Sequence, residues 1–233
     1  MSRGILRHPI QDWPPRKATH ANTNLPEART VGAIGFTVKS GWACTVLVAL
    51  VDGAARVLDH GRLELSDPAL PESKQPYHDG AGTARKEGPA LSRLLGSVRT
   101  FAAASLKDRI ERFRTPGYPL KGAGIVVGSL IDPRQIANDH IRIHALEGRL
   151  FREIVQDAAE RAKLPCSLWR ERDLLAAARE TLGKPEAQLR IMLRNLGKPF
   201  PGPWRSEQKA AALAAWLVLT EAPRARASKK SLP

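Results

Sequence analysis

The sequence has few cysteines, few acidic residues and no long apolar run. Its two cysteines, Cys44 and Cys166, stand far apart and outside any CxxC-type motif. This disfavours a disulfide framework or a structural zinc site, and predicts a reducing, cytoplasmic location. The longest near-continuous apolar run, 42–51, has ten residues, whereas a membrane-spanning helix needs about 20. We therefore expect no membrane partner, and the basic amino end lacks the apolar stretch and cleavage site of a secretory signal.

The shortage of acidic residues leaves the chain strongly basic. Lysine and arginine number 37 against 23 aspartates and glutamates, which gives a formal charge of +14 over 233 residues. Such a charge favours polyanionic partners, with nucleic acid first. Aromatic residues make up 5% of the chain, so base-stacking platforms are disfavoured and binding is expected to depend on backbone charge and on salt.

Composition divides the chain into three parts. Residues 1–30 form a basic, proline-containing arm with five basic and two acidic groups, and residues 222–233 form a basic tail with four basic groups and no acidic one. The body, 31–221, carries regular hydrophobic patterns and is expected to fold as one domain. Together the two ends hold half of the excess charge, so the charge by itself does not fix the function.

Hydrophobic periodicity predicts an α/β domain. Three apolar, β-branched segments joined by tight turns predict an antiparallel meander, and the segments after them alternate between helical and strand patterns. A long Pro- and Gly-containing loop, 67–89, separates the two parts. The result is a mixed sheet flanked by helices. The predicted strands are 31–38, 42–51, 54–66, 122–130 and 165–169, and the predicted helices are 89–113, 136–163, 173–182, 185–196 and 206–220.

This order of elements is that of the RNase H-like fold, and local segments resemble RuvC-type resolvases and their YqgF relatives. The similarity covers roughly 31–220. The segments that carry it are AIGFTVKSGWACTV (33–46) for the first strand and turn, IVVG (125–128) for the fourth strand, 145–175 for the long helix and the strand after it, 183–197, and KAAALAAWLVL (209–219) for the final helix.

The resemblance implies a two-Mg²⁺ nuclease, but the expected carboxylates are missing. The family holds its metals with three or four carboxylates from separate elements, because negative charge is what binds the ions. The matching positions here are Thr37, Gly128, Gln208 and Ala211. Hydroxyl and amide groups do not supply that charge, so we expect weak or absent nuclease activity, with Mg²⁺ required only for cleavage and no cofactor required for binding.

Relocated carboxylates are the alternative. Asp132 follows the fourth strand and Glu207 begins the last helix, so these two are the candidate catalytic residues, with Glu171 and Asp173 nearby in sequence. Each also has a plain structural interpretation. An acidic residue at a helix amino end, such as Glu207, is favoured by the macrodipole, and Asp173 precedes a leucine run as an N-cap residue would.

The candidate nucleic-acid-binding residues are cations and one hydroxyl. The turn Lys39-Ser40-Gly41-Trp42 offers an ammonium, a hydroxyl and backbone amides to a phosphate, although a plain hairpin turn with Trp42 in the core is also typical of this pattern. Further on lie arginines that could follow a phosphate backbone or form a solvated face. The arginines selected are Arg142, Arg149 and Arg172, with Arg190 and Arg194 further along the chain.

Two further patterns are considered as candidate sites. His140, His144 and Glu147 follow the i, i+4, i+7 spacing of one helical face, which is able to hold a transition metal. No HExxH motif accompanies them, and we assign this face to solvent or nucleic acid and no residue to a metal. The loop segment 75–80 (QPYHDG) either contacts a base or is a structured surface loop.

The sequence therefore predicts a nucleic-acid-binding protein of RuvC/RNase H-like fold, acting on DNA or RNA. One alternative is an active, structure-specific nuclease with relocated carboxylates. Another is a translation-associated interaction module, since DGAARV (52–57) resembles strand turns of peptide-release-factor-like domains. The resemblance to resolvases, which meet a two-fold junction, also implies a homodimer.

Overall fold

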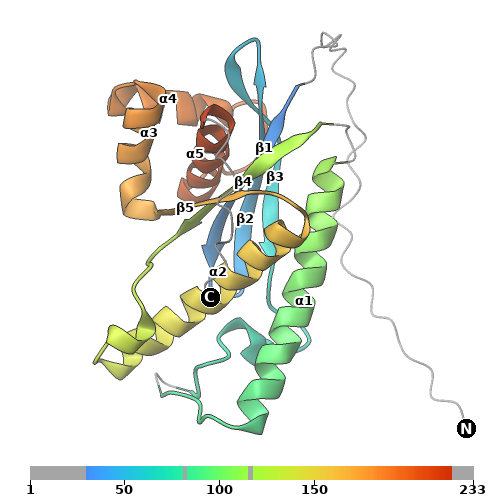
Figure 1. Cartoon of the computed structure of the whole chain (residues 1–233), viewed down its shortest axis with the longest axis vertical. Helices are drawn as coiled ribbons and strands as arrows, with labels where there is room; N and C mark the ends of the chain where they lie inside the picture. The colour runs from blue at the N-terminus through green and yellow to red at the C-terminus, as the bar shows by residue number, and fades with distance from the viewer. Residues whose placement is uncertain (1–29, 81–82, 115–117, 222–233) are drawn as a thin grey trace, which may run out of the picture.

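A computed structural model describes residues 30–80, 83–114 and 118–221 (Figure 1). Apart from Thr30, the predicted arm (1–30) and the predicted tail (222–233) lie outside these residues. The described body contains a single five-stranded sheet in the order β3-β2-β1-β4-β5. Its strands are β1 (Gly32–Lys39), β2 (Trp42–Val51), β3 (Ala54–Glu64), β4 (Leu120–Val127) and β5 (Cys166–Arg170).

The pairing of the strands confirms the predicted mixed sheet. β1, β2 and β3 form an antiparallel meander, while β4 pairs parallel with β1, and β5 pairs parallel with β4. This is the strand order and direction of the RNase H-like fold. The carboxyl ends of β1, β3, β4 and β5 consequently meet at one edge of the sheet, which we call the C-edge.

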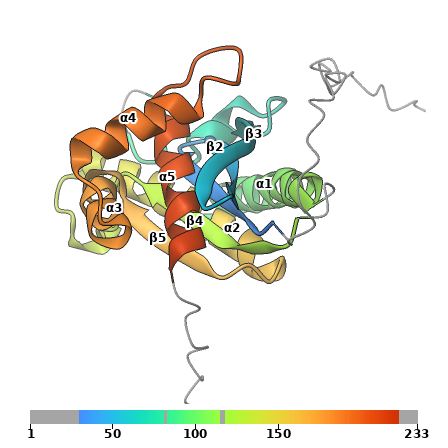
Figure 2. The same cartoon turned by 90° about the horizontal axis from the view of Figure 1, so that it is seen from above.

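Helices cover both faces of the sheet (Figures 1 and 2). α1 (Pro89–Arg114) and α2 (Asp139–Arg161) pack on one face around Phe36, Phe113 and Phe151. α5 (Ser206–Thr220) packs on the other face, with α3 (Leu174–Leu182) and α4 (Glu186–Leu196) outside it. The nine residues from Ala211 to Leu219 are all buried, as expected for a helix enclosed on every side.

Glycines in the central strands let α5 lie directly on the sheet. A Cβ atom built on Gly35 of β1 would lie 1.7 Å from the carbonyl oxygen of Ala211, and one built on Gly124 of β4 would lie 2.6 Å from the carbonyl of Ala214. The backbones of strand and helix are therefore in contact. α5 runs antiparallel to β1 and β4, because Glu207 lies near the end of β1 and Val218 near Gly122. Its amino end thus reaches the C-edge.

Element boundaries differ from prediction where the chain leaves the C-edge. The predicted strand 122–130 is β4, which begins at Leu120 and ends at Val127, so that 128–131 form an exposed loop. The predicted helix 136–163 begins at Asp139, because Asn138 caps it: the side-chain oxygen of Asn138 accepts a hydrogen bond from the amide of Ile141 (3.0 Å). The predicted loop 67–89 contains a 3₁₀ turn, Pro71–Lys74.

None of the described helices combines the length and apolar character required to cross a membrane.

Candidate nucleic-acid interface

The first turn of α5 lies against the end of β1 at the C-edge. The hydroxyl of Thr37 donates a hydrogen bond to the backbone carbonyl of Glu207 (2.9 Å), across 170 residues of sequence. Gln208 accepts a hydrogen bond from the amide of Arg205 (3.0 Å), and Ala211 lies on Gly35. Thr37, Gln208 and Ala211, which the resemblance assigns to metal-ligand positions, thus carry a buried hydroxyl, a capping amide and a methyl group.

A lysine occupies this part of the C-edge. The ammonium of Lys39, at the end of β1, lies 3.0 Å from the Glu171 carboxylate, just beyond β5. Hydrogen bonds from its own backbone amide and from Ser206, together with the charge of Lys39, lower the pKa of Glu207. Lys39 therefore pairs with Glu171 and adds positive charge near Glu207. The residues present do not fit a Mg²⁺ pair, which needs several carboxylates free to bind it.

Asp132 is engaged elsewhere. The guanidinium of Arg134 donates to its carboxylate at 2.6 and 3.0 Å, and Arg149 lies 3.8 Å away. The hydrogen bonds from Arg134 lower the pKa of Asp132 to about 2. Glu207 accepts a hydrogen bond from Ser206 instead (3.1 Å), and among the described residues no hydrogen bond or ion pair joins it to Asp132. A catalytic role for this pair stays a prediction.

Two other interpretations from sequence hold in part. Asp173 occupies the N-cap position of α3, but its side chain makes no capping hydrogen bond and pairs with Arg170. Trp42 packs against the core beneath α5 but is only partly buried, and the Arg62 guanidinium lies over its ring, 4.2 Å from the ring centroid. Cation–π contacts of this kind are typical of partly exposed tryptophans.

Cys44 pairs with Thr37 across β1 and β2, beside the C-edge. Burial, with a smaller contribution from the charge of Glu207, raises the pKa of the Cys44 thiol to about 12. Because the thiolate is the reactive form, Cys44 is not a nucleophile at this edge. Its role is to fill the core beneath α5.

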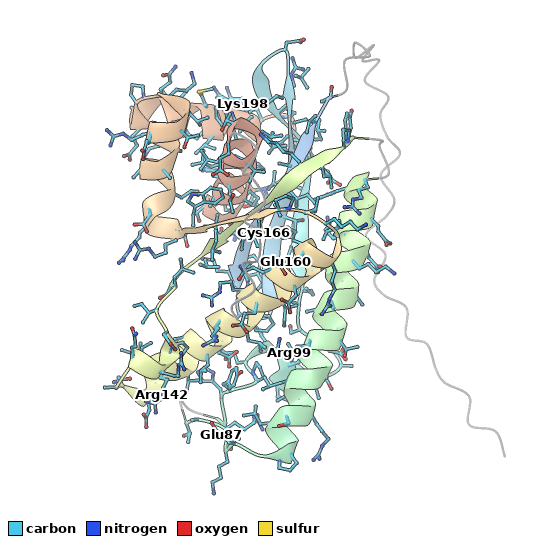
Figure 3. All side chains as sticks on the ribbon, in the orientation of Figure 1. Glu87, Arg99, Arg142, Glu160, Cys166 and Lys198 are labelled. Carbon is cyan, nitrogen blue, oxygen red and sulfur yellow. The ribbon has the colours of Figure 1, made fainter. Side chains whose placement is uncertain are left out.

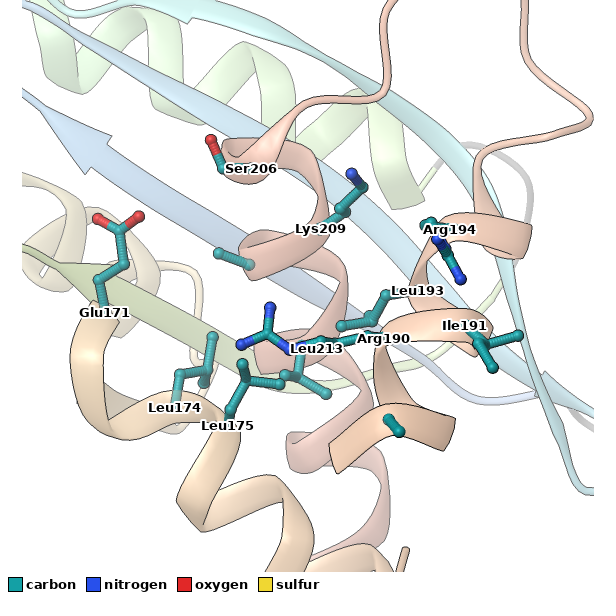
Figure 4. Close-up of a pocket in the computed structure, with 12 residues that line it drawn as sticks. Glu171, Leu174, Leu175, Arg190, Ile191, Leu193, Arg194, Ser206, Lys209 and Leu213 are labelled. Carbon is teal, nitrogen blue, oxygen red and sulfur yellow. The ribbon is translucent and has the colours of Figure 1, made fainter. Parts of the chain in front are cut away.

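A groove lies next to the C-edge, between α3, α4 and α5, and we call it the α3–α4–α5 groove (Figure 4). It encloses about 680 Å³ and begins at Glu171 and Ser206. Leu174 and Leu175 of α3 and Leu213 of α5 give it an apolar lining, while three cations project around it (Figure 4). These cations are Arg190 and Arg194 of α4 and Lys209 of α5.

The cations of the groove differ in their partners. Arg190 pairs with Glu186 (2.6 Å), one turn earlier on α4. The side chains of Arg194 and Lys209 make no hydrogen bond or ion pair with another residue in the part of the chain that the structure describes. Two unneutralised cations beside the amino end of a buried helix produce a positive potential suited to an anion.

The other candidate nucleic-acid-binding residues are dispersed. Arg142 bonds to the carbonyl of Ile136 (3.0 Å) and pairs with Asp139 at the start of α2, at the opposite end of the molecule from Lys198 (Figure 3). Arg149 pairs with Glu153 (2.7 Å).

The remaining candidates lie in turns. Arg172 is 72% exposed beside Asp173, and Ser40 lies in the turn after β1. Arg142 and Arg149 belong to α2, whereas Arg172 lies in the 3₁₀ turn after β5, and nucleic-acid binding by these residues stays a prediction.

Sequence reasoning missed one cluster on the α2 side. Glu147 was expected on an exposed face with His140 and His144, but its side chain is fully buried. The amide of Tyr77 donates to it (2.9 Å), and Nδ1 of His78 lies 3.1 Å from the same oxygen. Burial raises the pKa of Glu147 to about 7. No local signal links the loop at 75–80 to a helix some 70 residues later.

Replacing Thr37 with valine is expected to destabilise the domain by about 1–2 kcal/mol. Valine keeps the shape but removes the donor, so the Glu207 carbonyl at the start of α5 loses its partner. The measurement is urea unfolding followed by circular dichroism. As a control, Thr100→Val, at an exposed position of α1, is expected to change stability by less than about 0.5 kcal/mol. Equal stabilities for the two variants would contradict the role given to Thr37.

Similarity to known proteins is found among solved structures. No protein-family model matches the sequence, and no curated protein is significantly similar to it. Among solved structures, the chain is similar to Thermus thermophilus RuvC, with 14% identity, 81% of this chain and 92% of that chain covered, and a TM-score of 0.47. The same protein in complex with a Holliday junction substrate matches with 16% identity, 81% and 91% coverage and a TM-score of 0.47. The yeast mitochondrial Holliday junction resolvase matches with 11% identity, 82% and 79% coverage and a TM-score of 0.40.

Proposed function

We propose that this protein binds nucleic acid at the C-edge and in the α3–α4–α5 groove, and that it does so without two-metal hydrolysis. The observation that carries the proposal is the groove itself, where Arg194 and Lys209 have no described partner and Arg190 lies close by. Phosphate groups are the anions that such cations bind most generally. The excess of basic residues over the whole chain, +14, favours the same partner.

The chemistry of the C-edge supports binding over cleavage. In a two-metal site, carboxylates bind the ions and the ions stabilise the attacking and leaving oxygens. Here Lys39 neutralises Glu171, and Arg134 neutralises Asp132. With these carboxylates neutralised, the edge offers no set of free carboxylates to a metal pair, which favours holding a strand over cleaving it.

A binding and cleavage assay tests the proposal. Purified protein is mixed with a labelled four-way junction, duplex DNA and structured RNA over a salt series, with Mg²⁺, Mn²⁺ or chelator. We expect a gel shift that weakens by at least roughly 100-fold between 50 and 200 mM salt, and no cleavage on denaturing gels.

Each other outcome identifies a different alternative. Metal-dependent cleavage that is lost in Asp132→Asn or Glu207→Gln would show that the carboxylates are relocated and that our view of the C-edge is wrong. Absence of binding to all three substrates at low salt would refute nucleic-acid binding and favour an interaction module. Homodimerisation stays a prediction, tested by sedimentation of the free protein and of its complex with the junction.

A further inference from the structure

Three histidines from two distant segments meet beyond the C-edge, on the side of α2. His78 belongs to the loop between β3 and α1, while His140 and His144 lie one turn apart on α2. One ring nitrogen from each forms a set in which all separations are within 4.8 Å. Among the described residues, this is the one group of three or more histidine, cysteine, aspartate or glutamate side chains placed closely enough to hold a metal ion.

The distances suit nitrogen ligands of one small ion. The Nε2 atoms of His140 and His144 lie 3.2 Å apart. Two nitrogens bound to zinc at 2.0–2.1 Å in a tetrahedral site are separated by about 3.3 Å. The rings of His78 and His144 have centroids 4.8 Å apart. Rotation of the exposed His140 and His144 side chains is therefore enough to bring one nitrogen of each ring within bonding distance of a single ion.

Glu147 supplies the second, independent observation. Its side chain is fully buried, and one carboxylate oxygen, Oε1, faces Nδ1 of His78 at 3.1 Å. Its other oxygen, Oε2, is buried and has no hydrogen-bond partner among the described residues, which is costly for a polar atom. A carboxylate that accepts a hydrogen bond from one ring nitrogen of a histidine fixes the tautomer and directs the other nitrogen outward. That is the arrangement found behind metal-binding histidines.

We propose that His78, His140 and His144 bind a Zn²⁺ ion through their Nε2 atoms, with Glu147 positioning His78. Three protein ligands leave a fourth coordination position for water or a ligand group. The ion joins the loop at 75–80 to α2 and so fixes the long connection between β3 and α1. Histidine nitrogens and the lack of a carboxylate in the set favour zinc over Mg²⁺. This site is separate from the proposed nucleic-acid interface and does not depend on it.

Metal binding by the full-length protein tests the site. Metal-free protein is titrated with Zn²⁺ by calorimetry, and with Co²⁺ by visible absorption, which reports tetrahedral coordination. We expect one ion per chain and tetrahedral Co²⁺ bands. Zinc at 100 times its dissociation constant is expected to raise the melting temperature by roughly 5–10 °C.

Substitutions locate the ion. His140→Ala and His144→Ala replace exposed side chains, so we expect both variants to fold, as checked by circular dichroism, and to lose one-to-one binding. Glu147→Gln is expected to weaken zinc binding about 10- to 100-fold. The matched control is His60→Ala, whose histidine packs against Phe200 and Trp204 away from the cluster, and it is expected to bind zinc as the unaltered protein does.

Two results would overturn the proposal. One is the absence of stoichiometric zinc binding by the unaltered protein. The other is zinc binding that His140→Ala and His144→Ala leave unchanged, which would place the ion elsewhere, for example on histidines of the amino-terminal arm. Neither result bears on nucleic-acid binding, because Arg194 and Lys209 take no part in this cluster.

Discussion

Gly35→Ala is expected to destabilise the domain by roughly 3–5 kcal/mol, a large share of the 5–15 kcal/mol typical of a folded domain. The new methyl group would lie 1.7 Å from the carbonyl oxygen of Ala211 and 2.5 Å from its carbonyl carbon. Both atoms are backbone, so no rotamer change relieves the overlap. Either α5 moves away from the sheet or β1 distorts, and both open the core around Ala33, Val46 and Ala215.

Chemical denaturation measures this effect, with Gly96→Ala as the matched control. Gly96 lies within α1, and a Cβ atom there meets nothing within 4 Å. The same chemical change is therefore expected to stabilise the protein by about 0.5–1 kcal/mol, because alanine favours the helix. If Gly35→Ala is as stable as the unaltered protein, α5 does not pack on β1 as described.

Arg194→Ala/Lys209→Ala is expected to weaken nucleic-acid binding roughly 10- to 50-fold at moderate salt. This prediction rests on the proposed function. Both cations line the α3–α4–α5 groove without a described partner, so each is free to contact a phosphate. Removing two such contacts lowers the slope of log affinity against log salt by about two. Fluorescence anisotropy over a salt series measures both quantities.

The control removes the same charge from the opposite side of the sheet. Arg93 and Lys107 are exposed on α1, so Arg93→Ala/Lys107→Ala changes the net charge equally without touching the groove. We expect at most a small, long-range loss of affinity. Equal losses in the two double variants would show that binding depends on overall charge and that the groove is not the interface.

The local sequence pattern was sufficient to predict most of the helices and strands. The β-branched segments and tight turns of 31–66 specify a meander, and α1 (Pro89–Arg114) and α5 (Ser206–Thr220) match their predicted ranges within one residue. Hydrophobic periodicity and turn-forming residues act between positions close in sequence, so they can be recognised from the sequence alone. Predicted boundaries were wrong where Asn138 caps α2, which begins at Asp139, and where β4 ends at Val127, before the predicted end of the strand.

The sequence by itself determined the RNase H-like order of elements, the basic charge, and the lack of carboxylates at Thr37, Gln208 and Ala211. Only the tertiary structure decided which charges meet. Lys39 pairs with Glu171 across 132 residues, and His78 meets Glu147 across 69. Whether a charged side chain is free, neutralised or buried depends on what the fold places within a few ångströms of it, because electrostatic and desolvation energies are set by distance and burial. That information is absent from local pattern, and it separates the neutralised Asp132 from Arg194 and Lys209, which have no partner among the described residues.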